Sequence, residues 1–354
     1  MAKNGRPTMA DVAAEAGVSL STVSLSYSGA GPISPEMKAR VEKAATALSY
    51  GGPSAAGRAL RSGRSRVVGV VIHDTLTLAF RAPLILQIMD GLISDLGDMG
   101  LGVLLLTSPS GAPEENSLLE TAPMDAAVLL RVRDHDEPAL EILRRRGIPI
   151  VVMDGPPPAG AGVVTIDDGA ATVDLILRLR ELGHERIGTV TLPIAPRGET
   201  ALRSLDDYRD SAWAPTQRRL HAFEEAGIAP CVIVSARESL VEEGIAAGHL
   251  ALTHESRPTA IVVQSDQLAA GVLLAARELD IRVPQDVSIT GFDGLSLPWL
   301  SPVELTTVVQ DGEKKGHALA AEVKSLLAGE TPEPASIPVE YREGNTTGRV
   351  NPDR

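Results

Sequence analysis

From residue 67 onward, short runs of apolar, β-branched residues alternate with longer segments of helical periodicity. The first run, Val67–Ile72, is continuous and bounded by polar residues, which is typical of a strand buried in a parallel sheet. The same alternation predicts further elements at 83–99, 101–106, 124–130, 138–146, 148–153, 163–166, 170–182, 186–192, 216–225, 231–235, 240–252, 260–263, 268–279, 287–292, 305–308 and 312–327.

Strands that alternate with helices in this way predict parallel sheets covered by helices on both faces. We expect about ten strands, which is more than one such sheet usually holds. The pattern therefore predicts an α/β fold with two lobes.

The first 66 residues show no strand pattern and predict short helices instead. Thr8 and Asp11 have the spacing of a capping box, with Asp in place of the usual Glu. Apolar residues follow at helical spacing as far as Ala16, and Gly17 can adopt the left-handed conformation that ends a helix.

Two more helices follow in this N-terminal segment. Ser19 or Ser21 can cap the second helix, and residues 29–32 break it. Ser34 and Pro35 start the third helix as N-cap and first-turn proline. Two short helices joined by a glycine turn, with a third closing the core, form a helix-turn-helix. On spacing alone, a generic three-helix bundle remains the alternative.

In a helix-turn-helix the second helix enters the major groove, and hydroxyls and backbone N–H groups near its start suit phosphates. The residues expected to contact DNA in this segment are Thr8, Ser19, Leu20, Ser21, Thr22, Ser24, Leu25 and Ser28.

Charge is distributed unevenly along the chain. The net charge of the 354 residues is −13, yet residues 1–66 carry +5 and the remainder −18. A basic N-terminal segment can bind a phosphate backbone, whereas an acidic remainder disfavours non-specific DNA contact. The distribution therefore supports a DNA-binding head on a body with another task.

The sequence gives little support for a secreted protein, a membrane protein or an enzyme. A single cysteine, Cys231, excludes an internal disulfide. Neither a signal peptide nor a membrane-spanning apolar run is present, so we expect a cytoplasmic protein that contacts no membrane. No dinucleotide-binding, P-loop or nucleophile-elbow motif appears, which predicts neither an enzyme nor a cofactor. The run 134–136 (Asp-His-Asp) is interpreted as a solvated loop rather than a metal site.

The segment 11–24, DVAAEAGVSLSTVS, resembles the N-terminal signature of the LacI/GalR (lactose-repressor) family, and the likeness continues through 41–50 and 57–65. In that family the segment after the third helix becomes a hinge helix on operator DNA. The resemblance implies that Leu60 inserts into the minor groove beside Arg58. Packing of Leu60 on the next domain is the alternative. Because glycines weaken helicity here, we expect this hinge to order only in a DNA-bound dimer.

One position departs from the family. Many members carry an arginine, which can read guanine, where this chain has Leu25. Sequence readout is therefore expected to rely on thymine methyl contacts and DNA shape.

The remainder also resembles the family's effector domain, which has the two-lobed type I periplasmic-binding-protein fold, in the stretches 182–188, 218–223, 263–271, 283–293 and 305–308. The family binds its effector between the lobes, at the carboxyl ends of the strands, where open parallel sheets generally bind ligands.

Three ligand-binding residues are implied by position in that family. Arg219 matches an arginine that grips effector oxygens, Asp293 a carboxylate that accepts effector hydroxyls, and Ser265 a common polar position. Asp154 is a weaker candidate of the same kind. The alternatives are a surface salt bridge for Arg219 and a helix or turn cap for Asp293.

Two segments depart from the effector domain of the family. Members often have Asn-Pro-Phe-Phe after the first strand, whereas residues 73–83 form a longer loop in which Asp74 and Phe80 are candidate ligand contacts. This change puts a simple sugar effector in doubt. Residues 193–215 are Pro-rich and then charged, and they are interpreted as a possible cleft-side loop.

The sequence as a whole predicts a homodimeric, DNA-binding transcriptional regulator, with repression implied by the resemblance, whose operator affinity responds to a small-molecule effector such as a sugar or related metabolite. The expected domains are a helix-turn-helix at 1–50, a hinge at 51–66 and an effector-binding and dimerisation domain at 67–354. Within that domain the N-lobe is expected at about 67–165 and 296–330, and the C-lobe at about 166–295 and 331–345. The C-terminus lacks leucine heptads, which argues against a tetramer. The alternatives are a sugar-binding transport or chemoreception protein of the same fold and, less favoured, an α/β sugar-processing enzyme.

Overall fold

The structure is a computed structural model that describes residues 7–29, 31–53, 63–72, 76–107, 117–130, 132, 137–195, 198–208 and 213–351. The chain divides into two compact units, Met1–Arg66 and Val67–Arg354, which are described separately.

The described residues of the first unit form three helices, α1 (Met9–Ala16), α2 (Leu20–Ser28) and α3 (Pro35–Ala47). Their apolar faces meet in a small core. The sequence predicted all three helices and their caps. Thr8 and Asp11 form the capping box, Gly17 is left-handed (φ 61°), and Ser34 caps α3 with Pro35 in its first turn.

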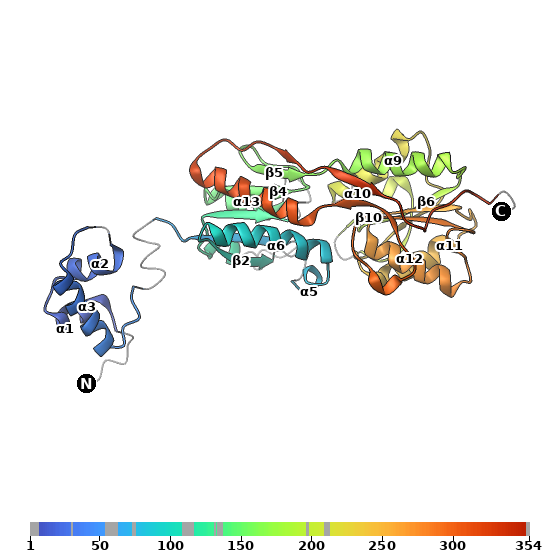
Figure 1. Cartoon of the computed structure of the whole chain (residues 1–354). Helices are drawn as coiled ribbons and strands as arrows, with labels where there is room; N and C mark the ends of the chain where they lie inside the picture. The colour runs from blue at the N-terminus through green and yellow to red at the C-terminus, as the bar shows by residue number, and fades with distance from the viewer. Residues whose placement is uncertain are drawn as a thin grey trace. The chain divides into compact units, whose positions relative to one another are not determined.

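The first lobe of the second unit is built on a six-stranded, fully parallel sheet in the order β12-β5-β4-β3-β1-β2. Its strands are β1 (Val67–Ile72), β2 (Gly102–Thr107), β3 (Ala126–Leu129), β4 (Ile150–Met153), β5 (Gly162–Thr165) and β12 (Ala335–Ser336). Helices α6 (Pro83–Asp98) and α13 (Gly312–Ala328) cover one face, as Figure 1 shows, and α7 (Ser117–Thr121) and α8 (Pro138–Arg145) pack on the other. Short α5 (Leu76–Ala79) precedes α6.

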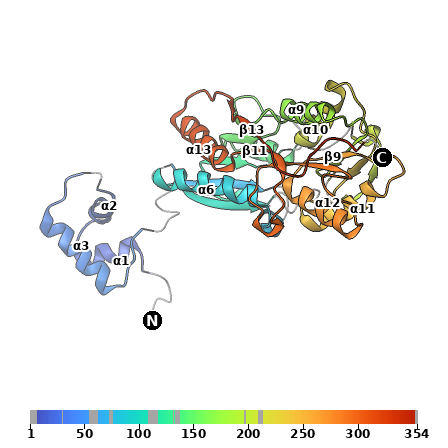
Figure 2. The same cartoon turned by 45° about the vertical axis from the view of Figure 1, so that its right-hand side comes forward.

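The second lobe has a seven-stranded sheet in the order β13-β11-β10-β9-β6-β8-β7, parallel except for its two edge strands. Its strands are β6 (Ile187–Thr191), β7 (Ala201–Arg203), β8 (Ile233–Ser235), β9 (Ala260–Val263), β10 (Ser288–Asp293), β11 (Thr306–Gln310) and β13 (Val339–Arg342). Helices α11 (Val241–Leu252) and α12 (Asp266–Glu278) cover one face, and α9 (Asp168–Glu181) and α10 (Ala214–Glu225) the other (Figure 2). Two 3-10 turns complete it, η2 (Leu205–Tyr208) and η3 (Pro298–Leu300).

The predicted α/β class with two parallel-sheet lobes is confirmed, but the C-terminal lobe boundaries differ from the expected ones. Residues 296–330 were expected in the N-lobe, yet β11 pairs with β10 in the second sheet. Residues 331–345 were expected in the C-lobe, yet β12 pairs with β5 in the first. The alternation of strands and helices predicted β11 but not which sheet it joins, and only η3 separates β10 from β11. Strand β12 itself was not predicted.

The chain crosses between the lobes three times, from β5 to α9, from β11 to α13 and from β12 to β13. Because each parallel strand ends at the same edge of its sheet, the residues after β4, β8, β9, β10 and β11 gather where the two lobes face one another.

Helices α6 and α13, which cover one face of the first sheet, are in close contact with each other. A Cβ on Gly316 of α13 would lie 2.2 Å from the Ile88 carbonyl oxygen, and one on Gly91 of α6 would lie 2.3 Å from the Glu313 carbonyl oxygen. Only glycine permits this approach, so α6 and α13 cross backbone to backbone.

Candidate functional site

The turn between α1 and α2 is held by contacts at both helix ends. Gly17 takes the left-handed conformation at the end of α1, and the Arg40 guanidinium donates to the Ala16 carbonyl oxygen at 2.7 Å. Ser19 then caps α2 by accepting from the Thr22 amide at 3.1 Å. These contacts fix the angle between the two helices, which decides how α2 can be presented to DNA.

The first turn of α2 is polar and exposed to solvent, whereas one side of the helix packs into the core of the three-helix unit. Val23 is fully buried in the three-helix core, and Leu20 is 53% exposed. The Ser19 hydroxyl lies 2.6 Å from that of Ser21 and 2.8 Å from that of Thr22. The first turn of α2 therefore presents clustered hydroxyls and one exposed apolar side chain, a surface that suits phosphates and a thymine methyl.

The other residues expected at DNA lie on the same unit with different surroundings. Thr8 is exposed, but its hydroxyl belongs to the capping box. Ser24 is half-buried, and exposed Ser28 donates to the Leu25 carbonyl oxygen at 3.4 Å. The Leu25 side chain packs against Gly31, because a Cβ on Gly31 would lie 3.2 Å from Leu25 Cδ1. Arg58 and Leu60 lie outside the described residues.

Tyr27 is a surface residue of α2 that the sequence argument missed. It is 39% exposed and packs edge-on against Tyr50, with ring centroids 5.8 Å apart. Its position three residues after Ser24 places it on the predicted DNA-facing side, so helical spacing could have identified it.

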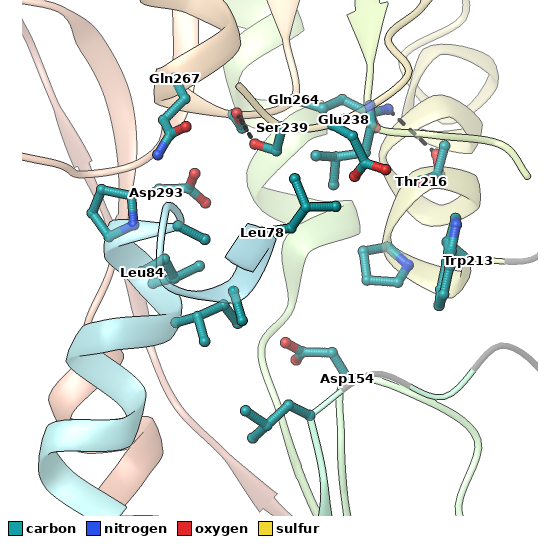
Figure 3. Close-up of a pocket in the computed structure, with 18 of the residues that line it drawn as sticks. Leu78, Leu84, Asp154, Trp213, Thr216, Glu238, Ser239, Gln264, Gln267 and Asp293 are labelled. Atoms are coloured by element: carbon teal, nitrogen blue, oxygen red, sulfur yellow. Dashed lines mark hydrogen bonds between the residues drawn. The ribbon is translucent and has the colours of Figure 1, made fainter. Parts of the chain in front are cut away.

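A cavity of about 160 Å³ lies between the two lobes of the second unit. Residues at strand ends line it, including Asp154 after β4, Gln264 and Ser265 after β9, Asp293 at the end of β10 and Gln310 at the end of β11. Figure 3 shows the Asp154, Glu238 and Asp293 carboxylates around the same space.

Four side chains connect the lobes in a hydrogen-bonded chain. The fully buried Lys315 ammonium of α13 donates to the Asp154 carboxylate and, at 3.1 Å, to the Gln310 side-chain oxygen. The Gln310 amide donates to the Asp293 carboxylate at 2.6 Å. Lys315 was not predicted, because its helical position gave no sign that it would face the cleft.

Arg219 lines the cavity, but its guanidinium is held by protein groups. It donates to the Asp168 carboxylate at 3.2 Å and to the Gln264 carbonyl oxygen at 2.6 Å, and it lies 3.6 Å from the Phe292 ring centroid. Arg218 donates to the same Asp168 at 2.6 Å. Arg219 is thus a buried, fixed cation rather than the surface salt bridge considered as the alternative.

Asp293 is an unusual carboxylate. Burial, and next the charge of Asp266, raise its pKa to about 7, although Arg219 acts in the opposite direction. Burial also raises the pKa of Asp266, which accepts from the Leu295 amide at 2.7 Å and the Thr307 hydroxyl at 2.6 Å. Near neutral pH, Asp293 can therefore either donate or accept a hydrogen bond.

Ser265 reaches the cavity and also caps α12, where it accepts from the Leu268 amide at 3.2 Å. Its hydroxyl lies 2.7 Å from that of Ser239, a lining residue that the sequence argument missed. Glu238 and Ser239 follow β8 closely, so the rule that ligands bind at strand ends could have found them. Trp213 and Gln267 also line the cavity.

Phe80, a candidate from the first cleft loop, is not brought to the cavity in this structure. Phe80 is 56% exposed and is not among the lining residues, whereas Leu78, Ala79 and Ala82 are. Asp74 lies outside the described residues. The aromatic ring at the cavity is that of Trp213, which the unusual segment 193–215 contributes.

Contacts across the open side of the cleft involve Arg81. Its guanidinium pairs with Glu242 of α11 at 2.5 Å, and its carbonyl oxygen accepts from the Gln267 amide of α12 at 3.0 Å. One residue of the first lobe thus binds two helices of the second.

Within the part of the chain that the structure describes, no cluster of three His, Cys, Asp or Glu side chains could hold a metal ion. None of the described helices is long and apolar enough to cross a membrane.

Together, the two units define a class of protein: a helix-turn-helix joined to a two-lobed domain with a cavity at the strand ends. Comparison with known proteins gives the family. Residues 8–52 match the family described as bacterial regulatory proteins, lacI family, and residues 176–347 match the periplasmic binding protein-like domain.

An HTH-type transcriptional regulator of Mycolicibacterium smegmatis is 33% identical over 327 residues, covering 88% of each chain. Two solved structures have the same fold: the lac repressor dimer bound to operator and the anti-inducer ONPF (TM-score 0.77, 21% identity, 97% and 100% coverage) and a CelR–cellobiose complex (0.67, 24%, 96% and 100%). The chain belongs to the LacI family and is a DNA-binding transcriptional regulator with an effector-binding domain.

Proposed function

We propose that this protein is a repressor that binds a pseudo-palindromic operator as a homodimer and changes its operator affinity when a small molecule occupies the cleft. The observation that carries the proposal is the pairing of the open first turn of α2 with a cavity lined by both lobes. Its site of action is the cytoplasm, where operator DNA lies, and its output is binding rather than catalysis.

The proposed DNA contacts are the first turn of α2, with Ser19, Ser21 and Thr22 on phosphates and Leu20 on base methyl groups. Leu60, flanked by Arg58, is proposed to insert into the minor groove, as the family resemblance implies. The basic charge of residues 1–66 supports this assignment.

The homodimer is supported by an apolar surface on α6. Leu86 and Ile93 are 44% and 45% exposed, and their i, i+7 spacing puts them on one side of the helix. The lac repressor in the structure cited above is a dimer bound to operator, and a two-fold dimer matches a two-fold operator.

The proposed effector contacts are Asp154, Ser265 and Asp293, with Arg219 fixing the cavity wall beside them. They belong to both lobes, so an occupant contacts both and favours one relative orientation of the lobes. A ligand changes operator affinity only to the extent that it binds the two arrangements differently.

The test is a gel shift of the full chain on DNA from its own promoter region. We expect a sequence-selective complex that weakens steeply as salt rises, because phosphate contacts release counterions. Binding that does not distinguish promoter DNA from random DNA of the same length would refute the operator proposal.

Leu60→Ala tests the minor-groove contact. We expect operator affinity to fall about tenfold, since a lost apolar insertion is worth on the order of 1–3 kcal/mol. Thermal stability of residues 67–354 should not change. Unchanged operator affinity would show that Leu60 has another role, such as packing on the next domain.

A further inference from the structure

The cavity has an apolar lining with a limited volume. Its walls include Leu78, Leu84 and Ile85 from the first lobe and Trp213 and Leu240 from the second. A cavity of roughly 150 Å³ lined by such groups accommodates benzene. At about 160 Å³ this one accommodates an apolar body the size of one six-membered ring.

Most of the charged side chains among the described lining residues are carboxylates. Asp154 comes from the first lobe, and Glu238 and Asp293 come from the second. Figure 3 shows all three carboxylates around the cavity. An anionic occupant would meet repulsion from both lobes.

Asp154 provides the most specific sign of a ligand. Lys315 binds one carboxylate oxygen, Oδ2, whereas the other, Oδ1, is buried and has no hydrogen-bond partner. A buried carboxylate oxygen without a donor is costly, and a ligand donor would remove that cost.

The cations near the cavity are already engaged. Arg219 is bound by Asp168, the Gln264 carbonyl oxygen and the Phe292 ring, and fully buried Lys315 is bound by Asp154 and Gln310. Among the described residues, Arg219 is the sole Lys or Arg that lines the cavity.

We propose that the cleft binds a small organic cation, with an ammonium head on Asp154 Oδ1 and an apolar body of about one ring between Leu84 and Trp213. The inference rests on the proposed function, because it names the class of effector for that site. A polyol would find partners on the polar side of the lining but would place its other hydroxyls against the aliphatic walls, whereas an ammonium on a ring matches both halves of the lining.

The experiment uses the full chain and four matched probes: benzylamine, benzyl alcohol, benzoate and ribose. Titration calorimetry and thermal shift are measured at pH 7.5. We expect benzylamine to bind at least tenfold more tightly than benzyl alcohol and to raise the Tm, whereas benzoate and ribose do not bind. Equal or tighter binding of benzyl alcohol, benzoate or ribose, or no binding of benzylamine at 10 mM, overturns the proposal.

Asp154→Asn locates the site. We expect benzylamine affinity to fall at least tenfold, while Asp174→Asn, an exposed carboxylate on α9, leaves it unchanged. Retention of benzylamine affinity in Asp154→Asn overturns the assignment to Asp154. If Asp154→Asn does not fold, the comparison of the four probes on the unaltered chain still decides the ligand class.

A gel shift on promoter DNA, run without any probe, separates this inference from the proposed function. A sequence-selective shift together with ribose binding would leave the regulator in place and remove the organic cation. Benzylamine binding without an operator complex would keep the organic cation as ligand and refute the proposed operator-binding function.

Discussion

Asp168 is the residue on which both cleft-side arginines converge. Its side chain is 1% exposed and accepts from Arg218 at 2.6 Å and from Arg219 at 3.2 Å. Because Arg219 also supports the cavity wall through the Gln264 carbonyl oxygen, Asp168 acts as a positioning residue for the cleft.

Asp168→Asn should therefore lower the free energy of unfolding, and Arg219 should be held less firmly in the cavity wall. Removal of one partner from a buried ion pair costs about 3–5 kcal/mol, and partial hydrogen bonding by Asn puts the expected loss toward the lower end. Chemical denaturation measures it. The control is Asp174→Asn on the exposed side of α9, for which a change within about 0.5 kcal/mol is expected.

The site residues show how far sequence reasoning extends at this scale. Arg219, Asp293, Ser265 and Asp154 all line the cavity, and they were proposed from the family resemblance rather than from the strand pattern. What each side chain does there could not be predicted. The engagement of Arg219 by Asp168 depends on packing between residues 51 positions apart.

His184 gives a pH prediction at the residue scale. Burial lowers its pKa; Nε2 lies 3.0 Å from the Gly348 carbonyl oxygen, and Nδ1 lies 3.0 Å from the Thr259 hydroxyl. A histidine whose folded pKa is depressed stabilises the fold above its ordinary pKa of 6.5, and that contribution is lost as the pH falls from 6.5 through the lower folded pKa.

We therefore expect the free energy of unfolding to fall between pH 7 and pH 5 by more in the unaltered chain than in His184→Gln. Denaturant melts of both proteins across this range measure the difference, in which the titrations of groups common to both proteins cancel. Parallel pH profiles of the two proteins would refute the role of His184.

At the scale of elements, α6 and α13 depend on glycine for their contact. Gly316→Ala puts a methyl carbon 2.2 Å from the Ile88 carbonyl oxygen, so the helices must move apart. Overpacking of this kind costs about 1–3 kcal/mol. Gly97→Ala, on the same α6 with no atom within 4 Å of the new Cβ, should instead leave stability unchanged or raise it by up to about 1 kcal/mol. Equal Tm values for both variants would contradict the packing argument.

The positions of helices and strands along the chain were predicted better than the sheet to which each strand belongs. The three N-terminal helices and most parallel strands follow from periodicity and caps. The sheet that β11 joins does not, because joining a sheet depends on contacts that are distant in sequence. Three short strands were not predicted, β7 (Ala201–Arg203), β12 (Ala335–Ser336) and β13 (Val339–Arg342), since two to four residues carry too little pattern to show a strand.

For the whole regulator, we propose that the cleft influences DNA binding through closure of the two lobes, and Arg81 contributes two of the contacts between them. The Arg81–Glu242 pair is about half exposed, so it is expected to contribute on the order of 0.2–1 kcal/mol to the closed arrangement. That is enough to change the ratio of closed to open molecules by up to about fivefold.

Trp213 offers a direct readout, because it lines the cleft and is 5% exposed, whereas Trp299, the second of the chain's two tryptophans, is 54% exposed. In a Trp299→Phe background, Arg81→Ala should increase acrylamide quenching of the remaining tryptophan, as the lobes separate and solvent reaches the indole. Arg144→Ala breaks an exposed pair with Glu141 within α8 alone and should leave quenching unchanged. Equal quenching in the Arg81 and Arg144 variants would mean that the ion pair with Glu242 does not hold the lobes together. Control of operator affinity would then have to rest on the ligand and on the hydrogen-bonded chain that joins the lobes through Lys315 and Gln310.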